Sequence, residues 1–420
     1  MDVIADLHVH SRFAMACSKN ITLRGMERTA LMKGINVLST GDFTHPLWME
    51  EIRKELEEDG EGTYKIKGSD GRVKFILGSE VCTVFDDGNG KQRRIHNCIL
   101  MPSLESAEAL NAELASKGNL SSDGRPVVNM RASELVEAAL SASKDAFVFP
   151  AHAWTPWFGV FGSMSGFDSM KDAYEDQEKH IRALETGLSS DPKMNWMVSK
   201  LDKYSLISNS DFHSLQKMGR EANIFKMEKI TYHNIISAIV GRRESGFDKT
   251  IEFYPEEGKY HFDGHRNCKF SIDPARSNTS VCPVCGRRLV RGVMHRVIDL
   301  ADREYGYVPS SAVPYVNLIP LIEILSYVAG KSAFSPIIIR EYERAISELG
   351  PEMQLLISAD LGKIEESMGA DVAHAIENIR DSRVNIKAGY DGVFGEIDPL
   401  GRKNYRGKDF GVQKELGNFM

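Results

Sequence analysis

The sequence carries a series of histidine and carboxylate residues at spacings that suit metal binding. His8 and His10 lie two residues apart, and so do Asp211 and His213. In an extended segment, residues two apart point to the same side, so each pair can face one ion. The series also includes Asp42, His45, Glu80, His96 and His152. Imidazoles together with carboxylates suit zinc, manganese or iron, and the size of the set indicates more than one ion, with Glu80 a candidate bridge.

Short apolar runs lie next to most of these residues and are candidate strands. Each run is rich in β-branched or large apolar side chains, as strands buried on both faces are. The runs are residues 3–5, 37–39, 75–77, 98–100, 147–149 and 205–207. Helical spacing separates them, for example at Leu104, Ala107 and Leu110 after a candidate cap at Ser103. This alternation favours an α/β fold with a largely parallel sheet or barrel, whose strand ends would bring most of the metal-binding residues together.

The composition indicates a globular protein of two or three domains. The 420 residues are 42% hydrophobic and 26% charged, and the net charge is −7. A nucleic acid would therefore have to bind a local basic patch and not the field of the whole chain. The sequence opens without the charged and apolar regions of a secretion signal, and polar residues interrupt its most apolar stretch, 315–329. We expect a cytoplasmic protein without a membrane partner, and a core helix at 315–329.

A second candidate metal site is built from cysteines. His265-x-x-Cys268 and Cys282-x-x-Cys285 form two closely spaced pairs separated by a short loop. This pattern predicts a tetrahedral structural zinc ion in a module too small to hold itself together by a core. His261 is the alternative to His265 as the histidine ligand.

Basic residues crowd the same segment. Nine cations stand against four aspartates there, although the chain as a whole is acidic, and such a patch suits a phosphate backbone. The alternative is a solvated basic face. The nine cations are Lys259, Arg266, Lys269, Arg276, Arg287, Arg288, Arg291, Arg296 and Arg303. Arg287, Arg288 and Arg291 are the candidate DNA-binding residues of the patch, and Lys19 and Arg220 could contact phosphate elsewhere.

These patterns divide the chain into four parts. The strand and helix alternation covers residues 1–254, and the candidate zinc module covers 255–308. Apolar residues then recur at helical spacing, as at Ile319, Ile322 and Leu325, so a mainly helical domain is predicted at 309–400. A Gly-rich stretch at 389–401 precedes a basic tail at 401–420.

Aromatic residues follow His152 directly. Trp154, Trp157 and Phe158 are candidate base-binding residues, because aromatic rings near a phosphoesterase centre could stack on a base or wedge into a helix. The alternative is that they pack the rim of the barrel.

The end of the tail has an amphipathic pattern. Gln413, Leu416, Phe419 and Met420 have the spacing of one helical turn that presents apolar side chains, with Gln413 beside them. This resembles the peptide of proteins that bind the sliding clamp PCNA, and it favours a monomer that binds the clamp. A frayed end is the alternative.

The first group of motifs resembles the polymerase and histidinol phosphatase (PHP) superfamily. The match consists of Asp-Leu-His-x-His at 6–10, a histidine after the second strand, Gly-x-Glu at 78–80, and Asp-x-His at 211–213. The resemblance implies a distorted (β/α)7 barrel with two or three metal ions at a phosphoesterase site. Residues 11–36 lack the further histidine that the superfamily usually has there.

The same resemblance implies three sets of ligands. One ion would lie on His8, His10, Glu80 and Asp211, a second on Glu80, His96 and His152, and a third on Asp42 or His45 with His213. The residues implied as catalytic are Asp211, His213, Glu80 and His8.

The combination of metal site, zinc module, helical region and tail resembles the endonuclease Q family over nearly the whole chain. The stretches that carry the resemblance are 6–19, 41–46, 152–158, 264–286 and 389–395. It implies a DNA repair endonuclease that cuts on the 5′ side of uracil, hypoxanthine, xanthine and abasic sites by metal-activated hydroxide, leaving a 3′-hydroxyl and a 5′-phosphate. It also implies two or three catalytic ions (Zn, Mn or Mg), one structural zinc, DNA and PCNA as partners, and an archaeal source.

Two other functions are compatible with parts of the sequence. A small-molecule phosphatase of the histidinol-phosphate type needs only the barrel, and has no use for a zinc module, a basic patch or a clamp peptide. A non-catalytic DNA-binding protein that associates with the clamp would not need the full set of metal ligands.

Overall fold

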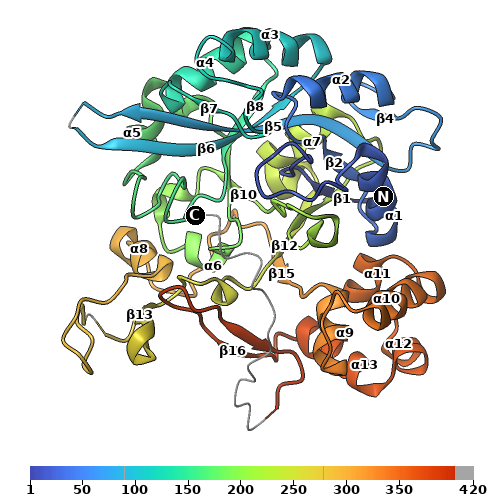
Figure 1. Ribbon diagram of the computed structural model, residues 1–420, viewed down its shortest axis with the longest axis vertical. Coiled ribbons are helices and arrows are strands. Elements are labelled where there is room, and N and C mark those ends of the chain that lie inside the picture. Colours follow the sequence, from blue (N-terminus) through green and yellow to red (C-terminus); the bar gives the residue numbers. More distant parts are fainter. Residues whose placement is uncertain (89, 278, 403–420) are drawn as a thin grey trace.

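The computed structural model describes residues 1–88, 90–277 and 279–402, and an eleven-stranded sheet lies at its centre (Figure 1). Eight strands follow in the order β15, β12, β11, β1, β2, β5, β4 and β3, while β6 and β7 pair with β5, and β8 pairs with β6. The strands are β1 (Asp2–Asp6), β2 (Val37–Ser39), β3 (Leu56–Glu58), β4 (Tyr64–Ile66), β5 (Lys74–Asp86), β6 (Gln92–Met101), β7 (Val127–Val128), β8 (Phe147–Pro150), β11 (Ala222–Lys226), β12 (Phe247–Glu252) and β15 (Tyr315–Asn317).

A separate parallel pair, β9 (Ala183–Glu185) and β10 (Ser205–Ile207), completes a barrel. β9 lies against β8, and the segment after β10 is joined to the segment after β1. Leu7 N donates to Asn209 Oδ1 at 2.8 Å, and Asp211 N donates to His8 O at 2.9 Å. The strands β1, β2, β5, β6, β8, β9 and β10 therefore form a distorted seven-stranded barrel within a mixed α/β fold, as the resemblance to the PHP superfamily implies.

The sheet is mixed, whereas the strand and helix alternation favours a largely parallel one. The predicted runs 75–77 and 98–100 are parts of the long strands β5 and β6, which pair antiparallel from Leu77 with Met101 to Asp86 with Gln92. The chain between them is too short to cross over the sheet, so an antiparallel hairpin is the available connection. Gly88 and Gly90 in this connection have φ of 81° and 78°, a conformation that favours glycine. The hairpin projects to the left in Figure 1.

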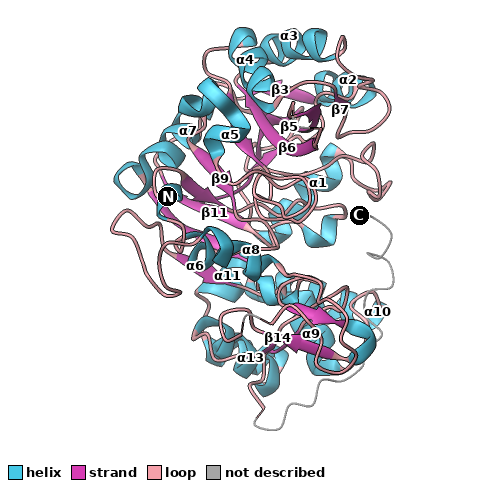
Figure 2. Ribbon diagram, turned by 90° about the vertical axis from the view of Figure 1, so that its left-hand side faces the viewer, coloured by secondary structure: helices cyan, strands magenta, loops and turns pink. Residues whose placement is uncertain are grey.

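Helices surround the barrel strands (Figure 2). They are α1 (Leu23–Lys33), α2 (Pro46–Glu55), α3 (Leu104–Leu114), α4 (Ala132–Ala142), α5 (Met170–Tyr174), α6 (Pro192–Asn195) and α7 (Tyr232–Gly241). The predicted cap of α3 is present, because the Ser103 hydroxyl accepts a hydrogen bond from Ser106 N at 3.2 Å. Short 3₁₀ helices lie at η1 (Glu175–His180), η2 (Ser199–Leu201), η3 (Leu215–Lys217), η4 (Arg242–Ser245), η5 (Pro255–Glu257) and η6 (Arg266–Cys268).

The cysteine-containing module packs on the barrel through an arginine. The module contains β13 (Asp263–His265), β14 (Phe270–Ile272) and α8 (Val293–Leu300). Arg296 on α8 donates to the carbonyls of Phe161 and Phe167, each at 3.0 Å, and pairs with Asp168 at 2.6 Å. The Arg296 guanidinium thus joins the module to the loop that follows His152, and Val293, Met294 and Val297 of α8 pack into the barrel's hydrophobic core.

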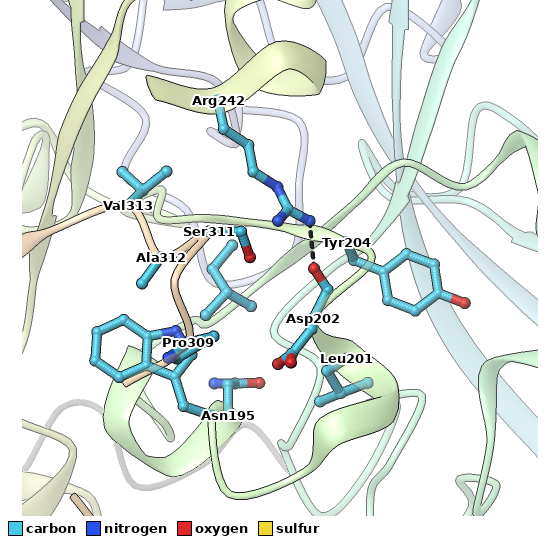
Figure 3. Close-up of a pocket in the computed structure, with 11 residues that line it drawn as sticks. Asn195, Leu201, Asp202, Tyr204, Arg242, Pro309, Ser311, Ala312 and Val313 are labelled. Atoms are coloured by element: carbon cyan, nitrogen blue, oxygen red, sulfur yellow. Dashed lines mark hydrogen bonds between the residues drawn. The ribbon is translucent and has the colours of Figure 1, made fainter. Parts of the chain in front are cut away.

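After α8 the chain crosses back to the sheet beside a small pocket (Figure 3). There Arg242 Nη2 donates to the carbonyl of Asp202 at 2.6 Å, and Arg303 pairs with the Asp202 carboxylate at 2.7 Å. The pocket has a volume of about 20 Å³, which is room for about one water molecule. It is therefore too small to be a substrate site.

A helical domain follows β15. It consists of α9 (Leu321–Ala329), α10 (Pro336–Leu349), α11 (Glu352–Ile357), α12 (Leu361–Met368) and α13 (Ala370–Arg380). A buried ion pair joins it to the barrel, with Lys33 Nζ 2.8 Å from Glu352 Oε2. The stretch 315–329, expected to be one helix, is the strand β15 followed by α9, since Pro320 interrupts it.

The Gly-rich stretch before the tail forms a hairpin, β16 (Asn385–Lys387) and β17 (Glu396–Asp398), that lies between the cysteine module and the helical domain (Figure 1). Phe262 N donates to Gly389 O at 3.0 Å. A side chain at Gly264 would place Cβ 2.3 Å from the Tyr390 ring, so glycine is required where the hairpin meets the module. No helix among the described residues combines the length and the apolar character needed to cross a membrane.

Candidate metal centre

Four side chains from three strand ends converge on one point. His8 and His10 follow β1, Glu80 lies on β5, and Asp211 follows β10. His10 Nε2 is 3.0 Å from Asp211 Oδ1 and 3.2 Å from Glu80 Oε2. His8 Nε2 is 3.5 Å from Glu80 Oε2 and 3.7 Å from Asp211 Oδ1. Four ligands at about 2.1 Å around a zinc-sized ion lie roughly 3.4 Å apart, so these spacings fit a shared cation.

A second group shares Glu80 with the first. Glu80 Oε1 is 2.8 Å from His96 Nδ1 on β6 and 3.0 Å from His152 Nε2 after β8. The two imidazole nitrogens are 3.2 Å apart. Glu80 thus turns one carboxylate oxygen toward each group, the arrangement expected of a carboxylate that bridges two ions.

Several atoms of the first group are buried without a hydrogen-bond partner. They are His8 Nε2, His10 Nε2 and Asp211 Oδ1. Burying polar atoms unpaired is costly, so their convergence indicates that something else satisfies them. Their donor chemistry fits a divalent metal ion.

The carboxylates of this centre are held in their charged form. Burial alone would raise the pKa of Asp211, but the imidazoles of His213, His8 and His10 hold that pKa well below its usual range. Burial likewise opposes ionisation of Glu80, and its neighbouring cationic groups, Arg125 and His8 among them, keep its pKa well below the usual value. Both carboxylates are therefore ionised, the form that binds cations.

Three of these positions have strained backbone. Asp42, His152 and Asp211 have φ of 45°, 30° and 46°, a region that side-chain-bearing residues seldom adopt. Strain of this kind persists where the surrounding structure holds a functional geometry.

Two further carboxylates orient the histidines of the first group. Asp42 Oδ1 accepts a hydrogen bond from His10 Nδ1 at 2.9 Å. Glu185 Oε2 accepts one from His8 Nδ1 at 2.9 Å. A carboxylate on Nδ1 places the proton there and leaves Nε2 free to bind a metal. Glu185 was not identified from the sequence. It is the last residue of β9.

The residues expected for a third ion form no comparable group. Asp42 faces His10, His45 stacks on Phe13 with ring centroids 4.4 Å apart, and His213 Nδ1 is 3.0 Å from Asp211 O. Among the described residues, the sets of three or more metal-binding side chains contain none of these three. The third ion stays a prediction from the resemblance.

The cysteine module contains a further set of side chains that could hold a metal ion. His265, Cys268, Cys282 and Cys285 have ligand atoms within 4.8 Å of one another. His265 Nδ1 is 3.3 Å from Cys285 Sγ, whereas His261 is buried beside Phe262 outside the group. Burial opposes ionisation of Cys282, but backbone N–H groups of Val284 and Cys285 help to lower its pKa to about 6, which favours the thiolate that binds metals. The set fits a bound ion, with His265 as its histidine.

Comparison with solved structures assigns the family. The structure of the lesion-specific endonuclease PfuEndoQ from Pyrococcus furiosus is 33% identical to this chain, with a TM-score of 0.84, and the match covers 94% of this chain and 95% of that one. The chain belongs to the endonuclease Q family. A second structure, of endonuclease Q with a 27-mer duplex that has an abasic lesion at its active site, is 32% identical with a TM-score of 0.82, over 98% of this chain and 100% of that one.

Two further relatives of this chain are uncharacterized proteins. YqxK of Bacillus subtilis is 28% identical over 94% of this chain and 99% of that protein. MJ0043 of Methanocaldococcus jannaschii is 31% identical over 59% of this chain, and the match spans 31% of that longer protein. A model of the MJ0043 C-terminal domain matches residues 320–383, which contain α9 to α13.

The aromatic residues after His152 differ in their exposure and therefore in whether they can contact a ligand. Trp154 is 1% exposed, and its Nε1 donates to Asn195 Oδ1 at 2.8 Å, so it packs the rim and presents no ring to a base. Phe158 stacks on His96 with centroids 4.4 Å apart. Trp157 is 40% exposed and can contact a ligand.

The basic residues predicted to contact phosphate also differ in their surroundings: some are exposed, and others bind groups of the protein. Arg220 donates to the carbonyl of Ser210 at 2.9 Å and so supports the segment that carries Asp211, while Lys19 is exposed. Arg287 and Arg288 are exposed on the cysteine module, and Arg291 pairs with Asp299 at 3.1 Å. The tail residues Gln413, Leu416, Phe419 and Met420 lie outside the described part of the chain.

A large pocket lies between the barrel and the cysteine module. It has a volume of about 560 Å³ and is bounded by the β5–β6 hairpin, the loop at 162–168 and α8. Its charged lining residues are the cations Lys91, Arg93, Arg291 and Arg296 together with Asp87, Asp168, Asp172 and Asp299. This pocket lies where the module meets the loop that follows His152.

Proposed function

We propose that this chain is a DNA repair endonuclease that hydrolyses the phosphodiester on the 5′ side of deaminated bases (uracil, hypoxanthine and xanthine) and of abasic sites, leaving a 3′-hydroxyl and a 5′-phosphate. Its membership of a family of DNA endonucleases supports the class of enzyme. The observation that carries the proposal is the pair of metal-binding groups that share Glu80. An abasic duplex at the active site of a 32% identical endonuclease Q supports the choice of lesion.

The proposed ligands are the members of the two groups. His8, His10, Glu80 and Asp211 would hold one divalent ion, and Glu80, His96 and His152 a second. Such ions lower the pKa of bound water and neutralise charge that develops on phosphorus. The protein's own part is to hold the imidazoles in the metal-binding tautomer, through Asp42 and Glu185, and to keep the bridging carboxylate ionised.

We further propose that residues 255–308 form a zinc module that contacts the DNA backbone. Arg287 and Arg288 are exposed on it and form no ion pair among the described residues, so their charge is available to phosphates. The pocket between module and barrel would receive DNA near the cut, with the damaged nucleotide turned out of the helix, which costs least where pairing is already weak. The divisions at 254, 308 and 400 are part of this proposal.

The sequence of the tail supports one more proposal, that Gln413, Leu416, Phe419 and Met420 bind the sliding clamp PCNA. Replacing Phe419 by alanine should abolish co-elution with an archaeal clamp and leave nicking of short linear duplexes unchanged. Undiminished co-elution would contradict this assignment.

The test of the main proposal is direct. Uracil, hypoxanthine, abasic and undamaged duplexes are incubated with the chain and Mg²⁺, Mn²⁺ or Zn²⁺, and the cut is mapped to the nucleotide. We expect lesion-dependent nicking on the 5′ side and its loss with a chelator. Release of phosphate from small monoesters, without nicking of any duplex, would favour a small-molecule phosphatase instead.

A further inference from the structure

One guanidinium reaches the metal-binding carboxylates. Arg125 Nη1 lies 3.2 Å from Glu80 Oε2, the oxygen that also faces both imidazoles of the first group. Arginine keeps its charge throughout the physiological pH range, so Arg125 is a cation beside this carboxylate. No sequence pattern had singled out this residue.

The backbone that carries Arg125 is fixed on the site. Gly124 N donates to Phe13 O at 3.1 Å, Arg125 N donates to Asp123 Oδ1 at 3.1 Å, and Pro126 O accepts from Cys82 N at 2.9 Å. A side chain at Gly124 would place Cβ 2.3 Å from Asp42 Oδ2, on the carboxylate that orients His10. The segment therefore approaches the centre as closely as glycine permits, and it sets the position from which Arg125 reaches in.

The guanidinium retains free hydrogen-bonding capacity. Arginine has five N–H donors, and among the described residues Glu80 is the acceptor found for this guanidinium. The Arg125 side chain is 24% exposed, so solvent and a substrate can reach it. Other cations near the centre are committed elsewhere: Arg220 to the carbonyl of Ser210, and Arg12 to Glu51.

We propose that Arg125 is a catalytic residue that donates hydrogen bonds to the non-bridging oxygens of the scissile phosphate. The planar fork of arginine matches phosphate oxygens and is always charged, so it stabilises the negative charge that builds up during hydrolysis. This inference rests on the proposed endonuclease function, and it adds the substrate-binding cation that neither Arg220 nor Lys19 supplies at this point of the structure.

Single-turnover nicking of a duplex with one abasic site tests the proposal. Arg125→Gln should lower the rate at saturating enzyme by about 10²–10³-fold, the usual cost of removing one donor to a developing anion. Its affinity for the duplex should change little, since one phosphate contact among many is lost. Arg125→Lys keeps the charge without the fork and should fall between the two. Arg12→Gln is the matched control, a half-buried arginine paired with Glu51, and should nick like the wild type.

Metal content and melting temperature are measured on every variant, because Arg125 also neutralises Glu80. If Arg125→Gln nicks as fast as the wild type, the inference is wrong while the endonuclease function stands. If Arg125→Gln has lost bound metal or melts early, and Arg125→Lys restores the metal content, the melting temperature and the nicking rate to the wild-type values, the role is structural and the inference is again overturned. If the wild type nicks no lesion duplex, the proposed function fails and the inference fails with it.

Discussion

Glu185 offers a sharp test of how the first metal group is held. Its carboxylate is 0% exposed and accepts hydrogen bonds from three groups. They are His8 Nδ1 at 2.9 Å, His152 N at 2.7 Å and Asn209 Nδ2 at 2.8 Å. Glutamine has a single acceptor oxygen and would turn an NH2 group toward a donor. Glu185→Gln therefore loses at least one hydrogen bond and places two donors face to face in a site without water contact.

The expected magnitude follows from these contacts. A buried polar group left without its partner costs about 1–3 kcal/mol, and two such groups are affected. Loss of a carboxylate that orients a ligand histidine weakens metal affinity by about 10–100-fold. We expect Glu185→Gln to bind Mn²⁺ or Zn²⁺ at the barrel site that much more weakly and to lower the free energy of unfolding by about 2–6 kcal/mol.

Glu252→Gln is the matched control for this experiment. Glu252 is also 0% exposed, and it accepts hydrogen bonds from Thr186 and Thr250 without contacting a metal-binding residue. Burial raises its pKa to about 8, which favours the protonated form at pH 7, so glutamine removes no charge that acts on the metal-binding groups and serves as the control for metal affinity. Metal affinity is measured by titration with inductively coupled plasma analysis of the dialysed protein, and stability by denaturant unfolding. Metal affinity of Glu185→Gln equal to that of the wild type would refute the reasoning.

Three further predictions concern the metal sites and pH. Asp211→Asn and His8→Ala should each abolish nicking while leaving duplex affinity, measured by fluorescence anisotropy, largely intact; undiminished cutting would contradict the ligand assignment. Cys282→Ser should remove one equivalent of bound zinc and lower the melting temperature, and an unchanged zinc content would count against the cysteine site. The folded-state pKa of Glu252, about 8, lies above its unfolded value near 4.5, so the folded chain keeps this proton and stability falls as pH rises between those values. Glu252→Gln should remove that part of the decline, and identical pH profiles of unfolding would show that the group does not titrate as inferred.

The residues of the two candidate metal-binding groups could be identified from the sequence because their signal is local. His8 and His10 directly follow an apolar run, and Asp211 follows another, so strand periodicity is enough to aim them at one end of a barrel. The same reasoning missed Glu185 because its strand has only two apolar residues and so gives no apolar run, and missed Arg125 because it lies in an irregular segment without periodicity. Spacing also could not tell that Asp42 faces a histidine ring, since that depends on a contact between two loops.

The exposure of individual side chains could not be predicted from the sequence either. Trp154 and Trp157 are three residues apart in the same loop, yet one is buried against Phe161 and the other is exposed. The direction of strand pairing depends on the length of connections, so the long β5–β6 hairpin could be recognised only in part, as two short apolar runs.

The pairing of β5 with β6 makes the metal centre depend on a single register. Glu80 opposes Cys98, and His96 opposes Cys82, along the same ladder. A slip of one residue would turn Glu80 to the opposite face of the strand and would carry His96 away from His152 at the same time. Both candidate metal-binding groups would then be lost together, so a hairpin in the wrong register would disrupt both groups and not one of them.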